Sequence, residues 1–340
     1  MFNVVFASSN EYSPFLLIAL TSLLENNTGF DCINIYILDN GINENNKNKI
    51  SALTEKYSCK ITFINNVLDS IDVNLPPIKL KSIWSTTAYA RLFISSILPE
   101  NIDKVLYLDS DALVLGSFKD LWDLDLEDYY CAGVIEPMAN ETVKELFWYY
   151  NVDDYINSGF LLINLKKWRE DNVEEKFIHF ISENNEKFFW ADQGVINLVL
   201  QGNIKIVEPK YNLLFYFQFH DYDIAKKFCG IKGEYYTKKI VDDSRNDPIF
   251  VHFAGGGYLC PWHNKNHKYN SVYRKYAKKA NCEDIFQYME APSWKSNLFF
   301  KDNKLIVFLL KLIPSNFIID YMNKSWILNL KSQESKIEDS

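Results

Sequence analysis

Two aspartates, Asp109 and Asp111, follow an apolar run in the middle of the chain, and this pair constrains the fold most strongly. The run 105–108 is too short for a helix and is bounded by charge, so it predicts a fully buried strand. Open α/β sheets bind ligands at the carboxyl ends of their strands. Both carboxylates can converge there on one divalent cation, which prefers oxygen ligands. Short acidic pairs also form turns and cap helices, but the position after an apolar strand favours a metal site.

The first 65 residues alternate between strand and helix patterns. Strands are predicted at 2–7, 32–38 and 59–64, and helices at about 14–26 and 43–57. This alternation predicts a parallel sheet with crossover helices, and it makes the turn at 8–11 a place for nucleotide contacts. Glycine-rich phosphate motifs are absent from this turn, which disfavours a Rossmann dehydrogenase or a P-loop enzyme.

Later segments carry further candidate site residues, each with a structural alternative. The apolar stretch 86–96 predicts a helix with one charge, Arg91, which either pairs with a structural carboxylate or steadies a phosphate or an acidic site residue. An Asn-Ser-Gly turn at 157–159 opens onto a predicted strand. Asp192 precedes an apolar run and is a candidate helix cap.

A further predicted strand at 249–253 carries His252 near its end, before three glycines that let the backbone approach a ligand closely. A histidine in such a place is often structural. It is also able to join Asp109 and Asp111 on a metal, and a mixed oxygen and nitrogen ligand set favours Mn²⁺ over Mg²⁺ or Ca²⁺.

Composition excludes several classes of protein. A net charge of −8 disfavours general nucleic-acid binding, although it leaves a nucleotide ligand open. The six cysteines form no C-x-x-C pair, which is typical of reduced thiols in a cytoplasm. The N-terminus lacks a basic region, and apolar runs are too short to span a bilayer. We therefore expect a cytoplasmic protein, either free or peripheral on the inner face of the cell membrane.

The C-terminal region differs from the rest of the chain. Between residues 294 and 331 there are six Lys and two Asp, a charge of +4, together with short apolar clusters. This pattern suits helices lying on an anionic membrane surface, and the alternative is a small helical addition packed on the main domain. The expected organisation is a catalytic domain at 1–280, a helical extension at 281–331 and a disordered tail at 332–340.

Six stretches in order resemble the family 8 glycosyltransferases, and most closely the bacterial galactosyl- and glucosyltransferases that extend lipopolysaccharide or other cell-surface glycans. They are Phe6-Ala7-Ser8-Ser9-Asn10-Glu11-Tyr12, Thr87-Ala88-Tyr89-Ala90-Arg91-Leu92, Val105-Leu106-Tyr107-Leu108-Asp109-Ser110-Asp111, Asn157-Ser158-Gly159 through Leu165-Lys166-Lys167-Trp168, Ala191-Asp192-Gln193, and His252-Phe253-Ala254-Gly255 with Pro261-Trp262-His263. The resemblance covers roughly residues 1–265. It implies an α/β fold of the GT-A type with a mixed, mostly parallel central sheet, and a small helical C-terminal extension besides.

The resemblance also implies a reaction: transfer of galactose or glucose, with retention, from a UDP-sugar to a glycan or lipid-linked saccharide acceptor. The cofactor is Mn²⁺, with Mg²⁺ as an alternative, and the implied metal ligands are Asp109, Asp111 and His252. The implied donor-binding residues are Ala7, Ser8, Ser9 and Glu11 at the uridine, Arg91 near the sugar and pyrophosphate, Ser110 beside the metal ligands, Asn157, Ser158, Asp192 and Gln193 around the sugar, and Gly255 and Gly257 at the diphosphate. Gln193 and Asp192 are the implied catalytic residues.

Two other functions remain open on the residues alone. A sugar-phosphate nucleotidyltransferase is also α/β and metal-dependent, but it needs a glycine-rich basic loop after the first strand, where Ser8-Ser9-Asn10-Glu11 stands instead. A non-catalytic glycan-binding protein with a relict site is the other, and the presence of Asp109, Asp111, Asp192 and His252 together argues against it.

Overall fold

The computed structural model describes residues 1–65, 86–137, 154–184, 191–229, 231, 233 and 235–289. Its strands are β1 (Phe2–Ser9), β2 (Ile33–Asn40), β3 (Cys59–Asn65), β4 (Lys104–Leu108), β5 (Ala112–Val114), β6 (Cys131–Gly133), β7 (Phe160–Asn164), β8 (Ile204–Ile206) and β9 (Phe250–His252). Within these ranges, seven strands form one sheet in the order β3-β2-β1-β4-β7-β6-β8, and β5 pairs with β9 in a second, two-stranded sheet.

The helices connect and cover these strands. The longer ones are α1 (Ser13–Asn26), α2 (Glu44–Ser51), α9 (Val173–Asn184), α10 (Ala191–Val199), α13 (Lys238–Asn246) and α14 (Asn270–Lys279). The shorter ones are α4 (Thr86–Tyr89), α5 (Ile94–Ile97), α6 (Lys119–Trp122), α8 (Leu165–Glu170), α11 (Phe215–Phe219) and α12 (Tyr222–Phe228), with 3₁₀ turns η1 (Ala52–Glu55), η2 (Ala90–Phe93), η4 (Pro209–Tyr211), η5 (Gly257–Leu259) and η6 (Glu283–Ile285).

The main sheet is mixed and mostly parallel. β1 pairs in parallel with β2 and β4, β2 with β3, and β6 with β8. β7 runs antiparallel to its two neighbours, β4 and β6. The predicted α/β class and the predicted run of strand, helix, strand, helix, strand at the N-terminus are both confirmed.

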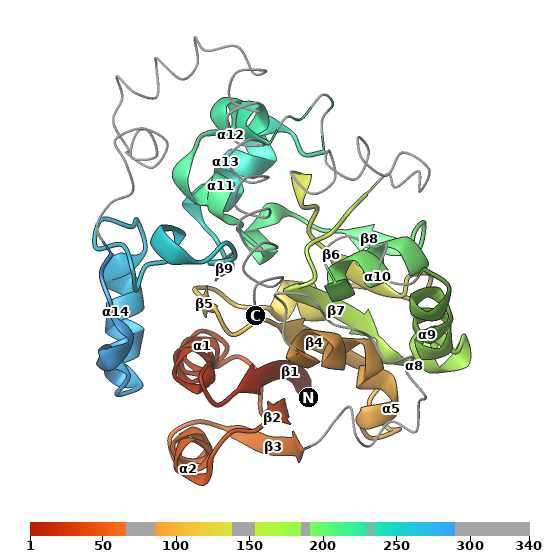
Figure 1. Cartoon of the computed structure of the whole chain (residues 1–340), viewed down its shortest axis with the longest axis horizontal. Coiled ribbons are helices and arrows are strands. Elements are labelled where there is room, and N and C mark those ends of the chain that lie inside the picture. The colour runs from red at the N-terminus through yellow and green to blue at the C-terminus, as the bar shows by residue number, and fades with distance from the viewer. Residues whose placement is uncertain are drawn as a thin grey trace, which may run out of the picture.

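Both faces of the sheet are buried at its centre, which explains why β4 and β7 are continuously apolar, whereas the edge strand β3 alternates. Val4 and Leu106 belong to one apolar cluster, and their chain neighbours Val5 and Tyr107 belong to another. Residues of α1 and α14 pack in the first cluster, and those of α8, α9 and α10 in the second. Figure 1 shows these two groups of helices on opposite sides of the sheet.

The stretch 86–96 differs from the single helix that its sequence predicts. It consists of α4, η2 and α5, because Phe93 has φ −114° and ψ 20°, outside the helical region. The turn that follows is capped by another element: Glu174 Oε1 accepts hydrogen bonds from the backbone N–H groups of Ser95 and Ser96, at 2.8 and 3.0 Å. The contact with Glu174 therefore stabilises the start of a new helix at a place where the sequence pattern alone predicts one uninterrupted helix.

The expected C-terminal extension lies mostly outside the described residues, as does the expected disordered tail. Its first part, up to Met289, packs on the main domain: the Tyr288 hydroxyl lies 2.6 Å from Arg274 Nη2 of α14, and the Met289 N–H donates to the His263 carbonyl at 2.9 Å. Of the helices placed in the structure, none is both long and apolar enough to cross a membrane.

Candidate metal and donor site

A cluster of Asp109, Asp111 and His252 lies where β4 ends. β4 stops at Leu108, the chain turns, and β5 begins directly after Asp111. The strand predicted to carry His252 is β9, and it belongs to the two-stranded sheet rather than to the main sheet. His252 ends β9, which pairs with β5 so that His252 lies opposite Ala112. This second sheet brings the ligand atoms of the three side chains within 4.8 Å of one another.

The geometry of this cluster fits one octahedral cation. His252 Nε2 lies 3.2 Å from Asp111 Oδ1 and 3.8 Å from Asp109 Oδ2. Neighbouring ligands held about 2.1 Å from a metal are about 3 Å apart, so small side-chain movements suffice. The Asp109 and Asp111 side chains are 26% and 28% exposed, which leaves an approach for a ligand from solvent.

The orientation of His252 is set from its other side. Nδ1 lies 3.2 Å from Oδ1 of Asn212, a fully buried residue. The amide oxygen only accepts, so it assigns the proton to Nδ1 and leaves the Nε2 lone pair for a metal, the arrangement typical of metal-binding histidines. Burial lowers the pKa of His252, but Asp111 and Asp109 raise it to a net value above its usual range. A proton and a divalent cation therefore compete for Nε2.

Arg91 is buried beside this cluster and fixes one oxygen of Asp109. Its Nη2 lies 3.1 Å from Asp109 Oδ1, and its Nε lies 3.1 Å from Asp192 Oδ2. The Tyr107 hydroxyl also donates to Asp109 Oδ1, at 2.9 Å, so Oδ2 is the oxygen that faces His252. Burial lowers the pKa of Arg91, but the charges of Asp109 and Asp192 raise it by more. The net pKa lies above the usual range, so the guanidinium stays charged. Arg91 thus pairs with two carboxylates, one of which belongs to the candidate metal cluster.

The residues expected around a sugar form a hydrogen-bonded group next to Arg91. Gln193 Oε1 accepts from Asn157 Nδ2 at 3.2 Å and from the Ser158 N–H at 3.1 Å. Arg91 Nη1 donates to the Ser158 carbonyl at 2.7 Å. Asp192 lies in the first turn of α10, and burial raises its pKa while Arg91 opposes the rise. All four expected residues are thus buried and close together, held by one another and by Arg91.

Glu136 was missed in the sequence analysis. It comes three residues after β6, and its Oε2 accepts from Asn157 Nδ2 at 2.7 Å. Burial raises the pKa of Glu136. The hydrogen bonds from Asn157 and Gln193 and the charge of His252 lower it by less, so the net pKa lies above the usual value. The sequence signal was available, because Glu136 follows an apolar run just as Asp109 does. Asn212 was missed too, and its local sequence offers no comparable signal.

The carboxyl end of β1 reaches the cluster through Ala7, whose carbonyl lies 3.5 Å from the Ser110 hydroxyl. β1 continues to Ser9, two residues beyond the predicted strand, so the turn predicted at 8–11 lies at 10–12. Ser8 is buried and its hydroxyl donates to the Ser9 carbonyl at 3.1 Å, while Glu11 is exposed. The neighbouring Tyr12 was not singled out from the sequence. It is 52% exposed, and burial of the rest of the ring, with the charge of Asp111, raises its pKa.

The expected glycines follow His252 as an exposed turn. Gly255, Gly256 and Gly257 have φ values of +120°, +65° and +54°, which residues with a side chain rarely adopt. A Cβ on Gly255 would meet Leu259 rather than a member of the metal cluster. The structure therefore explains the glycines by backbone conformation.

Comparison with known proteins gives one consistent result. Residues 3–266 match the model of glycosyl transferase family 8. A putative glycosyltransferase of Haemophilus influenzae is 34% identical over 228 residues, which is 66% of this chain and 66% of the relative. A lipopolysaccharide 1,2-glucosyltransferase of Escherichia coli is 30% identical over 266 residues, 77% of this chain and 73% of the relative. The galactosyltransferase LgtC, solved with donor and acceptor sugar analogues, shares the fold with a TM-score of 0.63 at 23% identity, over 86% of this chain and 99% of LgtC.

Gly159 offers a test of the cluster geometry. A Cβ at this position would lie 2.3 Å from His252 Cε1 and 2.6 Å from Asp109 Oδ2, so Gly159→Ala must displace two of the candidate metal ligands. We expect its affinity for Mn²⁺, measured by titration calorimetry, to fall by about tenfold or more, as when groups that orient metal ligands are changed. Gly29→Ala is the matched control, because nothing lies within 4 Å of the added Cβ. Equal affinities in the two variants would contradict the assignment.

Proposed function

Because the chain belongs to glycosyltransferase family 8, we propose that it transfers a hexose, galactose or glucose, from a UDP-sugar to a glycan acceptor with retention of the anomeric configuration. The observation that carries this proposal is the triad of Asp109, Asp111 and His252, with Nε2 of the histidine facing both carboxylates and Nδ1 facing Asn212. The names of a glucosyltransferase and a galactosyltransferase among similar proteins support a hexose.

Mn²⁺ is the cation we assign to this triad. Two carboxylates and one imidazole form a mixed ligand set that suits Mn²⁺ better than Mg²⁺. Without a cation, the carboxylates would repel the diphosphate of a nucleotide sugar. When bound, the ion supplies charge stabilisation for the leaving nucleoside diphosphate.

The nucleotide is assigned to the carboxyl end of β1 and the turn after it. β1 pairs in parallel with β4, and its Ala7 carbonyl lies near the hydroxyl of Ser110, the residue between the two aspartates. Tyr12 is half-exposed, and it lies close enough to Asp111 for the carboxylate to raise its pKa. It presents an aromatic surface on which a uracil ring can stack. Ser8, Ser9 and Glu11 are the other uridine candidates, and Gly255 and Gly257 stay candidates for the diphosphate.

The sugar is assigned to the group that links Arg91, Asp192 and Gln193. Asp192 is paired with Arg91, and the side-chain oxygen Oε1 of Gln193 accepts hydrogen bonds from Asn157 and Ser158. Asp192 and Gln193 therefore position hydroxyl groups of the sugar rather than attack it. The transition state is oxocarbenium-like. We favour departure and attack on the same face: the acceptor oxygen bonds to the anomeric carbon, the bond to UDP breaks, and the leaving phosphate takes the acceptor proton.

Donor choice tests the nucleotide assignment. With Mn²⁺ and no acceptor, the protein should slowly release UDP from UDP-galactose or UDP-glucose, because water replaces the acceptor hydroxyl. GDP- and CMP-sugars should be used little, since the proposed site is for uridine. A coupled assay for the released nucleotide across a donor panel measures this. Preference for a GDP-sugar would contradict the assignment of the turn after β1.

The metal assignment is tested by Asp111→Asn, which keeps the size of the side chain and removes its charge. If the metal supplies several kcal/mol of charge stabilisation, release of UDP should fall by about a thousandfold. Asp31 is exposed and does not belong to the cluster, so Asp31→Asn removes the same charge elsewhere and serves as the control. Near-normal rates for Asp111→Asn, or full activity of the parent protein in EDTA, would show that the triad does not hold a catalytic metal.

A further inference from the structure

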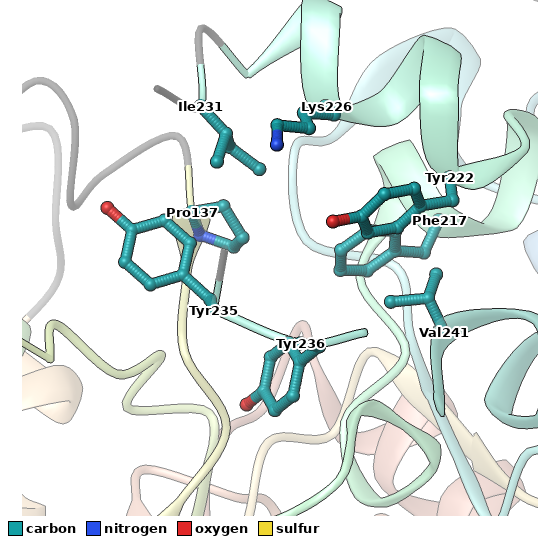
Figure 2. Close-up of a pocket in the computed structure, with 8 residues that line it drawn as sticks. All are labelled: Pro137, Phe217, Tyr222, Lys226, Ile231, Tyr235, Tyr236 and Val241. Atoms are coloured by element: carbon teal, nitrogen blue, oxygen red, sulfur yellow. The ribbon is translucent and has the colours of Figure 1, made fainter. Parts of the chain in front are cut away.

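A pocket lined mainly by rings lies next to the candidate site, and its residues have no part in the function proposed so far. Pro137, Phe217, Tyr222, Tyr235, Tyr236 and Lys226 provide most of its wall (Figure 2). Counting the part that is open to solvent, the space between them is about 250 Å³. Much of this space is open to solvent, so the pocket takes at most one ring, lying against its walls with an edge in solvent.

The pocket is connected to the candidate site through the chain beyond β6. Pro137 directly follows Glu136, and consecutive Cα atoms are about 3.8 Å apart. The opposite wall is fastened to the same segment: the Tyr236 hydroxyl accepts from the Ile135 N–H and donates to the Val207 carbonyl, both at 2.9 Å. The pocket wall is therefore fastened to the segment that carries Glu136, whose carboxylate accepts a hydrogen bond from Asn157 of the candidate site.

The ring surfaces indicate the kind of ligand. Phe217, Tyr222, Tyr235 and Tyr236 present flat apolar surfaces, and the tyrosines add polar hydroxyls at the edges. A sugar ring has matching properties, because its axial C–H groups form an apolar face and its hydroxyls lie around the rim. A few polar groups in an apolar pocket then set the orientation of the ring.

Lys226 adds a positive charge to this pocket. None of the lining residues is acidic. In the described part of the chain, Lys226 Nζ forms no ion pair, whereas nearby Asp223 pairs with Lys238 at 2.7 Å and Asp221 caps α12. Figure 2 shows the ammonium directed toward the space between Pro137 and Tyr222. Lys226 is partly buried, and an ammonium beside apolar rings favours an anionic partner.

We propose that this pocket binds a sugar ring of the acceptor that carries a negative charge, with the ring against the aromatic surfaces and the anionic group at Lys226. The proposal rests on the glycosyl transfer proposed above and specifies the chemical class of its acceptor. The anionic group is either the carboxylate of a uronic acid or a phosphate ester on a sugar, since both accept hydrogen bonds from an ammonium.

Matched acceptor pairs test this proposal. The rate of UDP release above the acceptor-free rate is measured with p-nitrophenyl glucuronide against p-nitrophenyl glucoside, and with glucose 6-phosphate against glucose. The charged member of one pair should have a kcat/KM higher by about tenfold or more, the usual effect of one hydrogen bond between charged groups. The pair that shows the preference identifies the carboxylate or the phosphate as the recognised group.

Variants assign the preference to the pocket. Lys226→Ala should abolish it while leaving acceptor-free UDP release unchanged, and Lys227→Ala, the next residue of α12 and outside the pocket, should keep it. Tyr222→Ala should lower kcat/KM for charged and neutral acceptors alike. Equal use of charged and neutral acceptors by the parent protein, or a preference that survives in Lys226→Ala, would overturn the proposal.

Failure of the proposed function gives a different result, because the parent protein would then release no UDP from any UDP-sugar. The pocket is then tested by binding alone. Titration of glucuronate and of glucose 6-phosphate into the protein, followed by NMR, should show saturable binding of at least one that is lost in Lys226→Ala. Binding that is absent, or unchanged in Lys226→Ala, would overturn the pocket assignment.

Discussion

The buried guanidinium of Arg91 is the interaction on which the rest of the site depends. It lies between Asp109 at the end of β4 and Asp192 in α10, and it donates to the Ser158 carbonyl before β7. A buried charge is tolerated only when it is paired, and removing one partner of such a pair costs about 3–5 kcal/mol. The three segments are therefore held in one arrangement, and with them the oxygen of Asp109 that faces His252.

A chain of side-chain amides extends this arrangement. Asn212 lies against His252 Nδ1 and donates through Nδ2 to Asn157 Oδ1 at 3.0 Å, and Asn157 in turn donates to Glu136 and Gln193. Each amide both accepts and donates, so one fixed geometry satisfies the whole series. The residues assigned to the metal and those assigned to the sugar thus form one buried polar network. We therefore expect a substitution at one member to shift the positions of the others.

The sequence predicted what depends on local pattern. The buried strand before Asp109 and the alternation of the first 65 residues are confirmed, because continuous apolar runs and crossover helices follow from a sheet buried on both faces. The strand that carries His252 was predicted, but its pairing with β5 was not, since this pairing depends on a contact between residues far apart in sequence. Asn212 and Lys226 were missed for the same reason: their significance comes from neighbours that only the folded chain provides.

We propose that Asp109, Asp111 and His252 together hold one divalent cation. The most direct measurement is an anomalous difference map, recorded at the manganese absorption edge from crystals grown with Mn²⁺ and UDP. We expect one strong peak for each chain, within bonding distance of both carboxylates and of His252 Nε2, with UDP phosphate oxygens completing the coordination. A map without a peak among these three side chains, with UDP bound and Mn²⁺ elsewhere, would contradict it.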